Sequence, residues 1–329
     1  VNLRNARTAA GIGAALAAAA AVASGQGEIA GIGVAGAATT AQRLFFVHTR
    51  AEENAADQSG MRFLASAGID PQGMLEVIDI FRGQEVLSAS RQDPYARTHP
   101  LSRDRYRVVK RLAEGYAGRT VDNPTAEYWF QRAKAKLSAF QRAPKWTLNR
   151  AGESGFADVA AMRQAIAYHR QSDLNRAVGA IDRAIAQRPN DPFYYELKGQ
   201  ILMESRRFQA AVHAYVTSTK LAPKNALILG SYGRSLMAVD QTNTAIKYLE
   251  QARARDGRDP RVLRDLAQAY AQRGNSGMAS LVTAERYAMT GRLADAGIHA
   301  KRASDLLPRG STGWRRAQDI LAAAERAAK

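Results

Sequence analysis

The sequence predicts an all-α protein whose carboxy-terminal half is a tandem helical repeat. Hydrophobic residues make up 46% of the 329 residues but aromatic residues only 7%. A composition rich in Ala favours helix-on-helix packing over sheets, which prefer β-branched and aromatic residues. In addition, Pro189 and Pro223 are 34 residues apart, and self-similarity at such a period indicates stacked helical pairs.

The residues before these prolines repeat in phase. Small residues allow the two helices of a unit to approach closely, large residues fill the groove between them, and the proline ends the second helix. These are the small and aromatic positions of the tetratricopeptide repeat, so we expect a solenoid, with an ordinary helical bundle as the alternative. The three units contain Ala165, Tyr168, Ala177, Ile181 and Ala184, then Gly199, Leu202, Ala211, Tyr215 and Ser218, then Gly233, Leu236, Ala245, Leu249 and Ala252.

The pattern continues more loosely towards the carboxy terminus, where a last amphipathic helix from Trp314 to Ala328 is expected to cap the stack. A solenoid is an interaction surface and carries no chemistry by itself. His169, His213 and His299 lie within it at no metal-ligand spacing, so we interpret them as structural or surface residues. The looser units contain Leu263, Ala267, Tyr270 and Ala279, then Ala284, Tyr287, Ala296, Ala300, Ala303 and Pro308.

The formal net charge of +17 indicates a surface that attracts polyanions. The basic residues are spread from Arg4 to Lys329 without a nucleic-acid-binding motif, so a nucleic-acid partner is not expected. The absence of cysteine excludes disulfide scaffolds and Cys-ligated metal sites.

The amino-terminal segment imitates a signal peptide over residues 1–24. Its Ala-rich run, and a second Gly-rich run over residues 29–41, are too short in strongly apolar residues for a membrane span, so none is expected. The chain begins with Val1 and not Met, which favours an internal piece of a longer polypeptide.

Helical periodicity between Thr40 and Ser66 predicts a helix, which Gly68 ends in a left-handed conformation. Asp70 and Pro71 then cap a second helix that is expected to run through Met74, Val77, Ile78 and Phe81. The inner side of the first helix is expected to hold Leu44, Val47, Ala51, Ala55, Gly60 and Phe63 or Leu64.

Two carboxylates on this first helix, Glu53 and Asp57, are four residues apart and share a face. Taken alone they have two interpretations. One is a solvated face on which Arg50 neutralises them. The other is half of a metal site.

A longer stretch bears on this choice. The segment EENAADQSGMRFLASAGIDPQGMLEVIDIF, followed by THPLSRDR, resembles the BepA-like (YfgC-like) zinc metallopeptidases, relatives of HtpX. In that family a Glu-x-x-Ala-Asp motif follows the helix with His-Glu-x-x-His, an Asp-Pro run and a Thr-His-Pro segment come next, and tetratricopeptide repeats complete the chain. The matching segments here are 53–57, 67–71 and 98–101, in the same order and spacing.

The resemblance implies a role for each site residue. Glu53 would be the third zinc ligand, and Asp57 would accept the free ring N–H of a ligating histidine. His99 would act as a gate at the open zinc position. Arg105 would steady the oxyanion or anchor the gate segment, with a plain surface arginine as the alternative.

The His-Glu-x-x-His motif itself is absent, because none of the five histidines is followed by Glu. Two explanations remain open, a truncated sequence and a degenerate homologue that has lost catalysis. In both cases we predict that this chain alone has no peptidase activity and that its zinc site is incomplete.

The resemblance divides the chain into carboxy-terminal helices of a gluzincin-type peptidase domain (1–117), a connecting helix from Glu127 to Arg142 with its linker (118–154), and the tetratricopeptide domain (155–329). It implies a zinc metalloendopeptidase in the periplasm, at or near the outer membrane. Its clients would be outer-membrane proteins or their assembly machinery, recruited by the repeats. The alternatives are a non-catalytic, chaperone-like scaffold and, on charge alone, a nucleic-acid-associated repeat.

Overall fold

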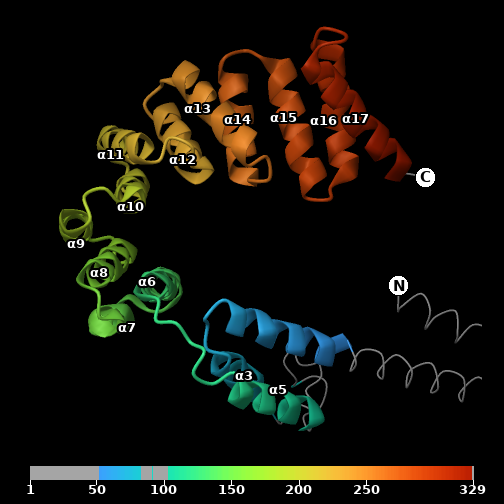
Figure 1. Cartoon of the computed structure of the whole chain (residues 1–329). Coiled ribbons are helices and arrows are strands. Elements are labelled where there is room, and N and C mark those ends of the chain that lie inside the picture. Colours follow the sequence, from blue (N-terminus) through green and yellow to red (C-terminus); the bar gives the residue numbers. More distant parts are fainter. Residues whose placement is uncertain (1–51, 83–90, 92–102, 328–329) are drawn as a thin grey trace, which may run out of the picture. The chain divides into compact units, whose positions relative to one another are not determined.

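The computed structural model describes residues 52–82, 91 and 103–327, and these residues form helices and no strand (Figure 1). The chain divides into two compact units, Val1–Asn123 and Pro124–Lys329. The segments resembling a signal peptide lie outside the described residues. Among the described residues no helix is long and apolar enough to cross a membrane.

In the first unit a helix over residues 52–66, α3 (Gln72–Ile80) and α5 (Arg103–Gly115) enclose a small apolar core. Gly68 has a φ of 71° and ends the helix at residues 52–66 as predicted. The Gln72 N–H donates to Asp70 Oδ1 at 2.9 Å, so Asp70 caps the next helix, also as predicted. The core residues are Met61, Leu75, Ile78, Val109 and Ala113.

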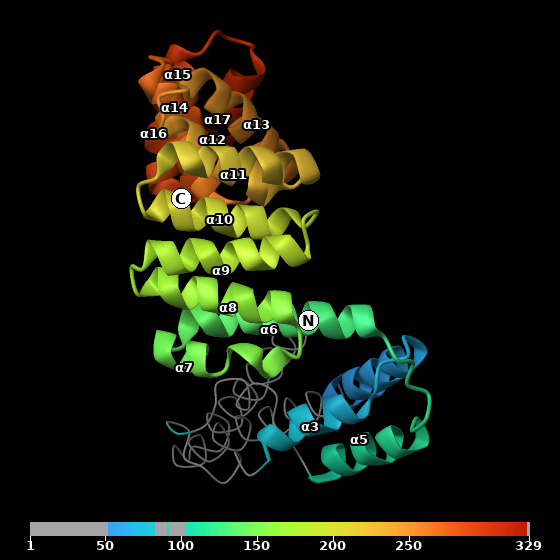
Figure 2. The same cartoon turned by 90° about the vertical axis from the view of Figure 1, so that its left-hand side faces the viewer.

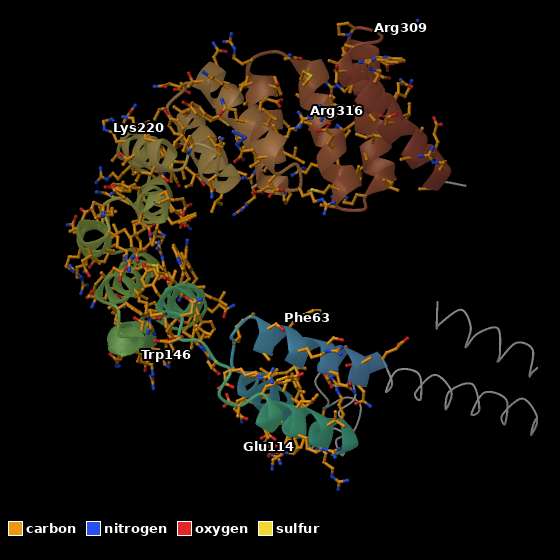
Figure 3. All side chains as sticks on the ribbon, in the orientation of Figure 1. Phe63, Glu114, Trp146, Lys220, Arg309 and Arg316 are labelled. Carbon is orange, nitrogen blue, oxygen red and sulfur yellow. The ribbon has the colours of Figure 1, made fainter. Side chains whose placement is uncertain are left out.

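The predicted inner side of the first helix is wrong over its described part. Phe63 is 73% exposed and points away from α3 and α5 (Figure 3), and Ala55 is also exposed. Asp57 and Met61 are buried instead. The helix turns its carboxylates inward because a partner cation from a distant segment neutralises them there.

The second unit begins with α6 (Pro124–Gln141), α7 (Pro144–Asn149) and a short 3-10 turn, η2 (Ala151–Ser154). Antiparallel helix pairs follow, stacked one upon the next (Figure 2). The three pairs predicted in phase are α8 (Ala157–Arg170) with α9 (Leu174–Gln187), α10 (Pro192–Glu204) with α11 (Phe208–Leu221), and α12 (Ala226–Met237) with α13 (Thr242–Arg255).

The looser carboxy-terminal units are helical as well. They are α14 (Pro260–Gln272), α15 (Ser276–Met289), α16 (Leu293–Leu306) and α17 (Thr312–Ala327). Here the pairing is less strict, because α15 packs extensively on both α14 and α16. The predicted cap is confirmed, since α17 closes on α16 and α15.

The predicted repeat positions hold the helices together. Ala165, Ala177, Ala211 and Ala245 are fully buried. A Cβ atom on Gly199 would lie 2.6 Å from the ring of Tyr215, which is why only glycine permits this close approach. The solenoid interpretation is therefore confirmed for residues 157–255.

The backbone repeats at the same period as the side chains. Ser172, Arg206, Asp240 and Gly274, each 34 residues after the last, adopt left-handed φ values of 59° to 71° in the turn between paired helices. The first helix of three successive pairs is capped by Asp191, Asn225 and Asp259, again 34 residues apart, whose side chains accept backbone N–H groups. Phase at 34 thus extends through α14 and α15.

A buried polar network fastens α6 to the first repeats. Asp158 Oδ2 accepts from the hydroxyls of Tyr128 at 2.6 Å and Tyr194 at 2.8 Å, and Arg188 Nε lies 2.8 Å from the same oxygen. Arg132 makes two hydrogen bonds to the carboxylate of Asp191, one of 2.9 Å. The predicted connecting helix is therefore packed as part of the repeat unit.

Candidate functional site

The predicted site residues of the first unit meet around one guanidinium. Arg105 Nε donates to Asp57 Oδ2 at 2.5 Å and Arg105 Nη2 donates to Asp57 Oδ1 at 2.9 Å. Nη2 of the same arginine lies 2.9 Å from Glu53 Oε2. Because Glu53 and Asp57 are one turn apart on the helix, a single arginine from α5 reaches both.

Burial settles which interpretation of these carboxylates holds. Asp57 is 3% exposed and Arg105 7% exposed, and the side chain of Glu53 is 15% exposed. A solvated face is therefore wrong, and so is the interpretation of Arg105 as a plain surface residue. The cation is Arg105. Arg50, the cation expected from the sequence, lies outside the described residues.

The cluster fixes the orientation of the carboxylate that we expect to bind a metal. A bidentate pair holds a carboxylate in plane with the guanidinium, and such outer partners orient metal ligands. Asp57 uses both oxygens on Arg105, which differs from the expectation that it serves chiefly a histidine ring N–H. An ionised carboxylate has about four acceptor sites, so the pair with Arg105 does not by itself use up the acceptor capacity of Glu53.

The described residues do not assemble a zinc site by themselves. Zinc sites use three or four N, O or S ligands, and the described part of the chain contains no group of three or more His, Cys, Asp or Glu residues that could hold a metal. Glu53 fits one ligand of a larger set. His99, the predicted gate, lies outside the described residues, six positions before Arg105.

The histidines of the repeat unit have ordinary surroundings, as predicted. His169 Nε2 lies 2.7 Å from Glu204 Oε2, and His299 stacks on the ring of Tyr287 with centroids 5.5 Å apart. His213 is exposed.

The sequence analysis did not single out Glu196, which lies beside a pocket of about 440 Å³ among the repeats. The signal was present, because Glu196 stands between the apolar residues Tyr194 and Leu197, both buried in α10. An acidic residue within a buried row requires a partner or a function.

Comparisons with known proteins give a family for the first part of the chain and structural neighbours. Residues 2–113 match the family model "Peptidase family M48". No curated protein matches the chain significantly.

Several solved structures of MamA are similar to about half of the chain. MamA MSR-1 C2 is 19% identical with a TM-score of 0.41, covering 50% of this chain and 97% of that one. MamA residues 41 to the end, from Desulfovibrio magneticus RS-1, is 16% identical with a TM-score of 0.43, covering 50% and 96%. A further crystal structure of MamA is 14% identical with a TM-score of 0.41, covering 52% and 96%. The chain thus combines a region of peptidase family M48, over residues 2–113, with a following region of tetratricopeptide-like helical repeats.

Proposed function

We propose that this chain is part of a zinc-dependent metalloendopeptidase of the bacterial envelope, of the BepA-like type. In it the repeats recruit polypeptide clients, outer-membrane proteins or their assembly machinery, and the location is the periplasm, with peripheral attachment to the outer membrane as an open alternative. The match of residues 2–113 to peptidase family M48 supports hydrolysis of polypeptides. The net charge of +17 suits acidic clients and the phosphates of the envelope surface.

The observation that carries the proposal is the pairing of Arg105 with Glu53 and Asp57. In this function Glu53 is the carboxylate ligand, Asp57 fixes the position of Arg105, and Arg105 holds Glu53 in one orientation. When bound, zinc in such a peptidase activates a water molecule for attack on the amide. His99 serves as the gate of the open position.

This chain supplies only part of that site, so it has no peptidase activity alone and binds zinc weakly. Calorimetric titration of the chain with zinc is expected to show no site of micromolar affinity. Glu76→Ala, on the exposed surface of α3, serves as the matched control. Micromolar affinity that disappears in Glu53→Ala but persists in Glu76→Ala would refute the incomplete site.

The decisive experiment is the intact mass and amino-terminal sequence of the protein in its source cells. A species well above 35.7 kDa whose additional segment contains His-Glu-x-x-His is expected. That species should cleave an unfolded outer-membrane protein, and the activity should be lost with a chelator and in Glu53→Gln.

A second candidate function is a non-catalytic scaffold, favoured by the absence of His-Glu-x-x-His from this chain. A mature protein that begins at or near Val1 and binds unfolded clients without cleaving them would establish it and exclude the peptidase.

A further inference from the structure

A polar pocket opens along one row of the repeat helices. We call α8, α10, α12 and α14, the first helices of the pairs, the inner row, and α6 lies against its beginning (Figure 1). The pocket has a volume of about 440 Å³ and is lined from α6, α10, α11, α12 and α14. This size lies within the range of ligand-binding pockets.

The deepest charged group in this pocket is the carboxylate of Glu196, whose side chain is only 6% exposed. The nearest cation, Lys136 Nζ of α6, lies 3.8 Å from Glu196 Oε2, which is longer than a hydrogen bond. Burial accordingly raises the pKa of Glu196, although Lys136 and Arg261 oppose the shift. A buried carboxylate in this position favours a ligand that brings N–H donors.

The rim of the pocket offers groups of the opposite kind. The side chains of Arg234 and Arg261 are 60% and 65% exposed, so their N–H donors are available without a large desolvation cost. A smaller hollow of about 50 Å³ shares both arginines and adds the carboxylates of Asp259 and Asp265. Donors and acceptors therefore alternate along the row, and neither charge sign dominates.

This alternation matches the main chain of an extended peptide. Each residue of a peptide presents one N–H donor and one C=O acceptor, whatever its side chain. Gln200 in the pocket wall both donates and accepts, and Met203 and Leu227 supply apolar contact for a client side chain.

The same row already binds a segment of this chain through polar contacts. Tyr128, Arg132 and Lys136 follow one another at four-residue spacing on one face of α6. They contact Asp158, Asp191 and Glu196 of the repeats, respectively. The pocket begins where this row of contacts ends, at Lys136.

We propose that the pocket binds an extended segment of an unfolded polypeptide through its main-chain amides. Main-chain N–H groups donate to Glu196, and main-chain carbonyls accept from Arg234 and Arg261. The proposal rests on the proposed function only in taking the bound segment to be a client. Recognition by the main chain suits the capture of clients that differ in sequence.

The test is fluorescence anisotropy of the chain with labelled peptides of equal length that are neutral, acidic or basic. All three are expected to bind with similar affinity. A neutral peptide with alternate amides N-methylated is expected to bind about tenfold more weakly, because it loses N–H donors. Glu196→Gln is expected to weaken binding of the unmodified peptide by about tenfold, since a charged acceptor becomes a neutral one.

The matched controls use arginine. Arg261→Gln is expected to weaken binding severalfold, whereas Arg302→Gln, on the exposed surface of α16, removes the same charge outside the pocket and leaves it unchanged. Circular dichroism checks the fold of each variant, and Ser231→Ala in the pocket wall replaces any variant that does not fold.

Equal binding of the N-methylated peptide, or binding of the acidic peptide alone, would overturn main-chain recognition. Unchanged affinity in folded Glu196→Gln would do the same. The assay requires neither zinc nor cleavage, so peptide binding without peptidase activity in the native species would retain this inference and reject the peptidase.

Discussion

Two buried ionic clusters, one in each unit, are built in opposite ways. In the first unit one guanidinium, Arg105, serves two carboxylates of a single helix. In the repeat unit one carboxylate, Asp158, accepts from three donors on separate segments. The cluster around Asp158 concentrates its donors on one oxygen and joins helices. The cluster around Arg105 orients carboxylates, which is the arrangement expected beside a metal ligand.

The largest effect is expected from removing the shared cation. Arg105→Gln leaves Asp57 buried without its guanidinium, and breaking such a buried pair costs about 3–5 kcal/mol. Urea denaturation followed by far-ultraviolet circular dichroism should show the loss in the first unit. Arg62→Gln, an exposed arginine on the same helix, is expected to change stability by less than about 0.5 kcal/mol. Similar midpoints for the two variants would contradict a structural role for Arg105.

The repeat cluster is tested from its acceptor. Asp158→Asn weakens three charge-assisted contacts and is expected to destabilise the second unit by about 2–3 kcal/mol. Tryptophan fluorescence reports this unit, because Trp129, Trp146 and Trp314 all lie in it. Asp182→Asn, which breaks the exposed pair with Lys198, should cost less than about 1 kcal/mol. An equal cost for both would show that burial adds nothing to the contacts of Asp158.

Acid titration gives the same cluster a sign. Burial tends to raise the pKa of Asp158, but hydrogen bonds from Tyr128 and Tyr194 and the charge of Arg188 outweigh it and lower the pKa. A lowered folded-state pKa contributes stability that is complete above the unfolded value of about 3.9 and is lost as the pH falls through the folded value. Wild type and Asp158→Asn should therefore converge in stability below about pH 4, and a constant difference down to that range would disprove the linkage.

Helix packing sharpens the comparison from the apolar side. A Cβ atom on Gly199 would meet the ring of Tyr215 at 2.6 Å, so Gly199→Ala is expected to cost about 1–3 kcal/mol in thermal unfolding. A Cβ atom on Gly179 would meet nothing within 4 Å, so Gly179→Ala should stabilise α9 by about 0.5–1 kcal/mol. The opposite signs separate crowding from helix propensity, and a gain at Gly199 would refute the close approach.

The smallest effect concerns the carboxylate with the weakest pairing. Burial raises the pKa of Glu196, so its ionisation costs stability as the pH rises through the folded-state pKa and costs nothing below the unfolded value of about 4.3. Glu196→Gln is expected to stabilise the repeats by about 1 kcal/mol at pH 7 and not below pH 4. Thermal unfolding at both pH values measures this, and a destabilised variant at pH 7 would place Glu196 with Asp158 as a structural acceptor.

The local sequence was sufficient for the repeats. Residue size at the helix crossings depends on neighbours within one unit, so Gly199, Ala211 and Tyr215 indicated their contacts through the period of 34 alone. The stop at Gly68 and the cap at Asp70 were predictable for the same reason, because glycine conformation and capping bonds involve adjacent residues.

The candidate site required more than one segment. The sequence placed Glu53 and Asp57 on one face but could not say whether that face was buried. The answer lay in Arg105, 48 residues after Asp57, and only folding brings that guanidinium to the carboxylates.

The sequence by itself determined the helical class, the phase of the repeats and the pairing of Glu53 with Asp57 on one helix face, since each follows from periodicity along the chain. The tertiary structure alone decided that this face turns inward, that Arg105 is buried, and that Glu196 borders a pocket. Each of these depends on charges from distant segments meeting at low solvent exposure, where an unpaired carboxylate is too costly to bury.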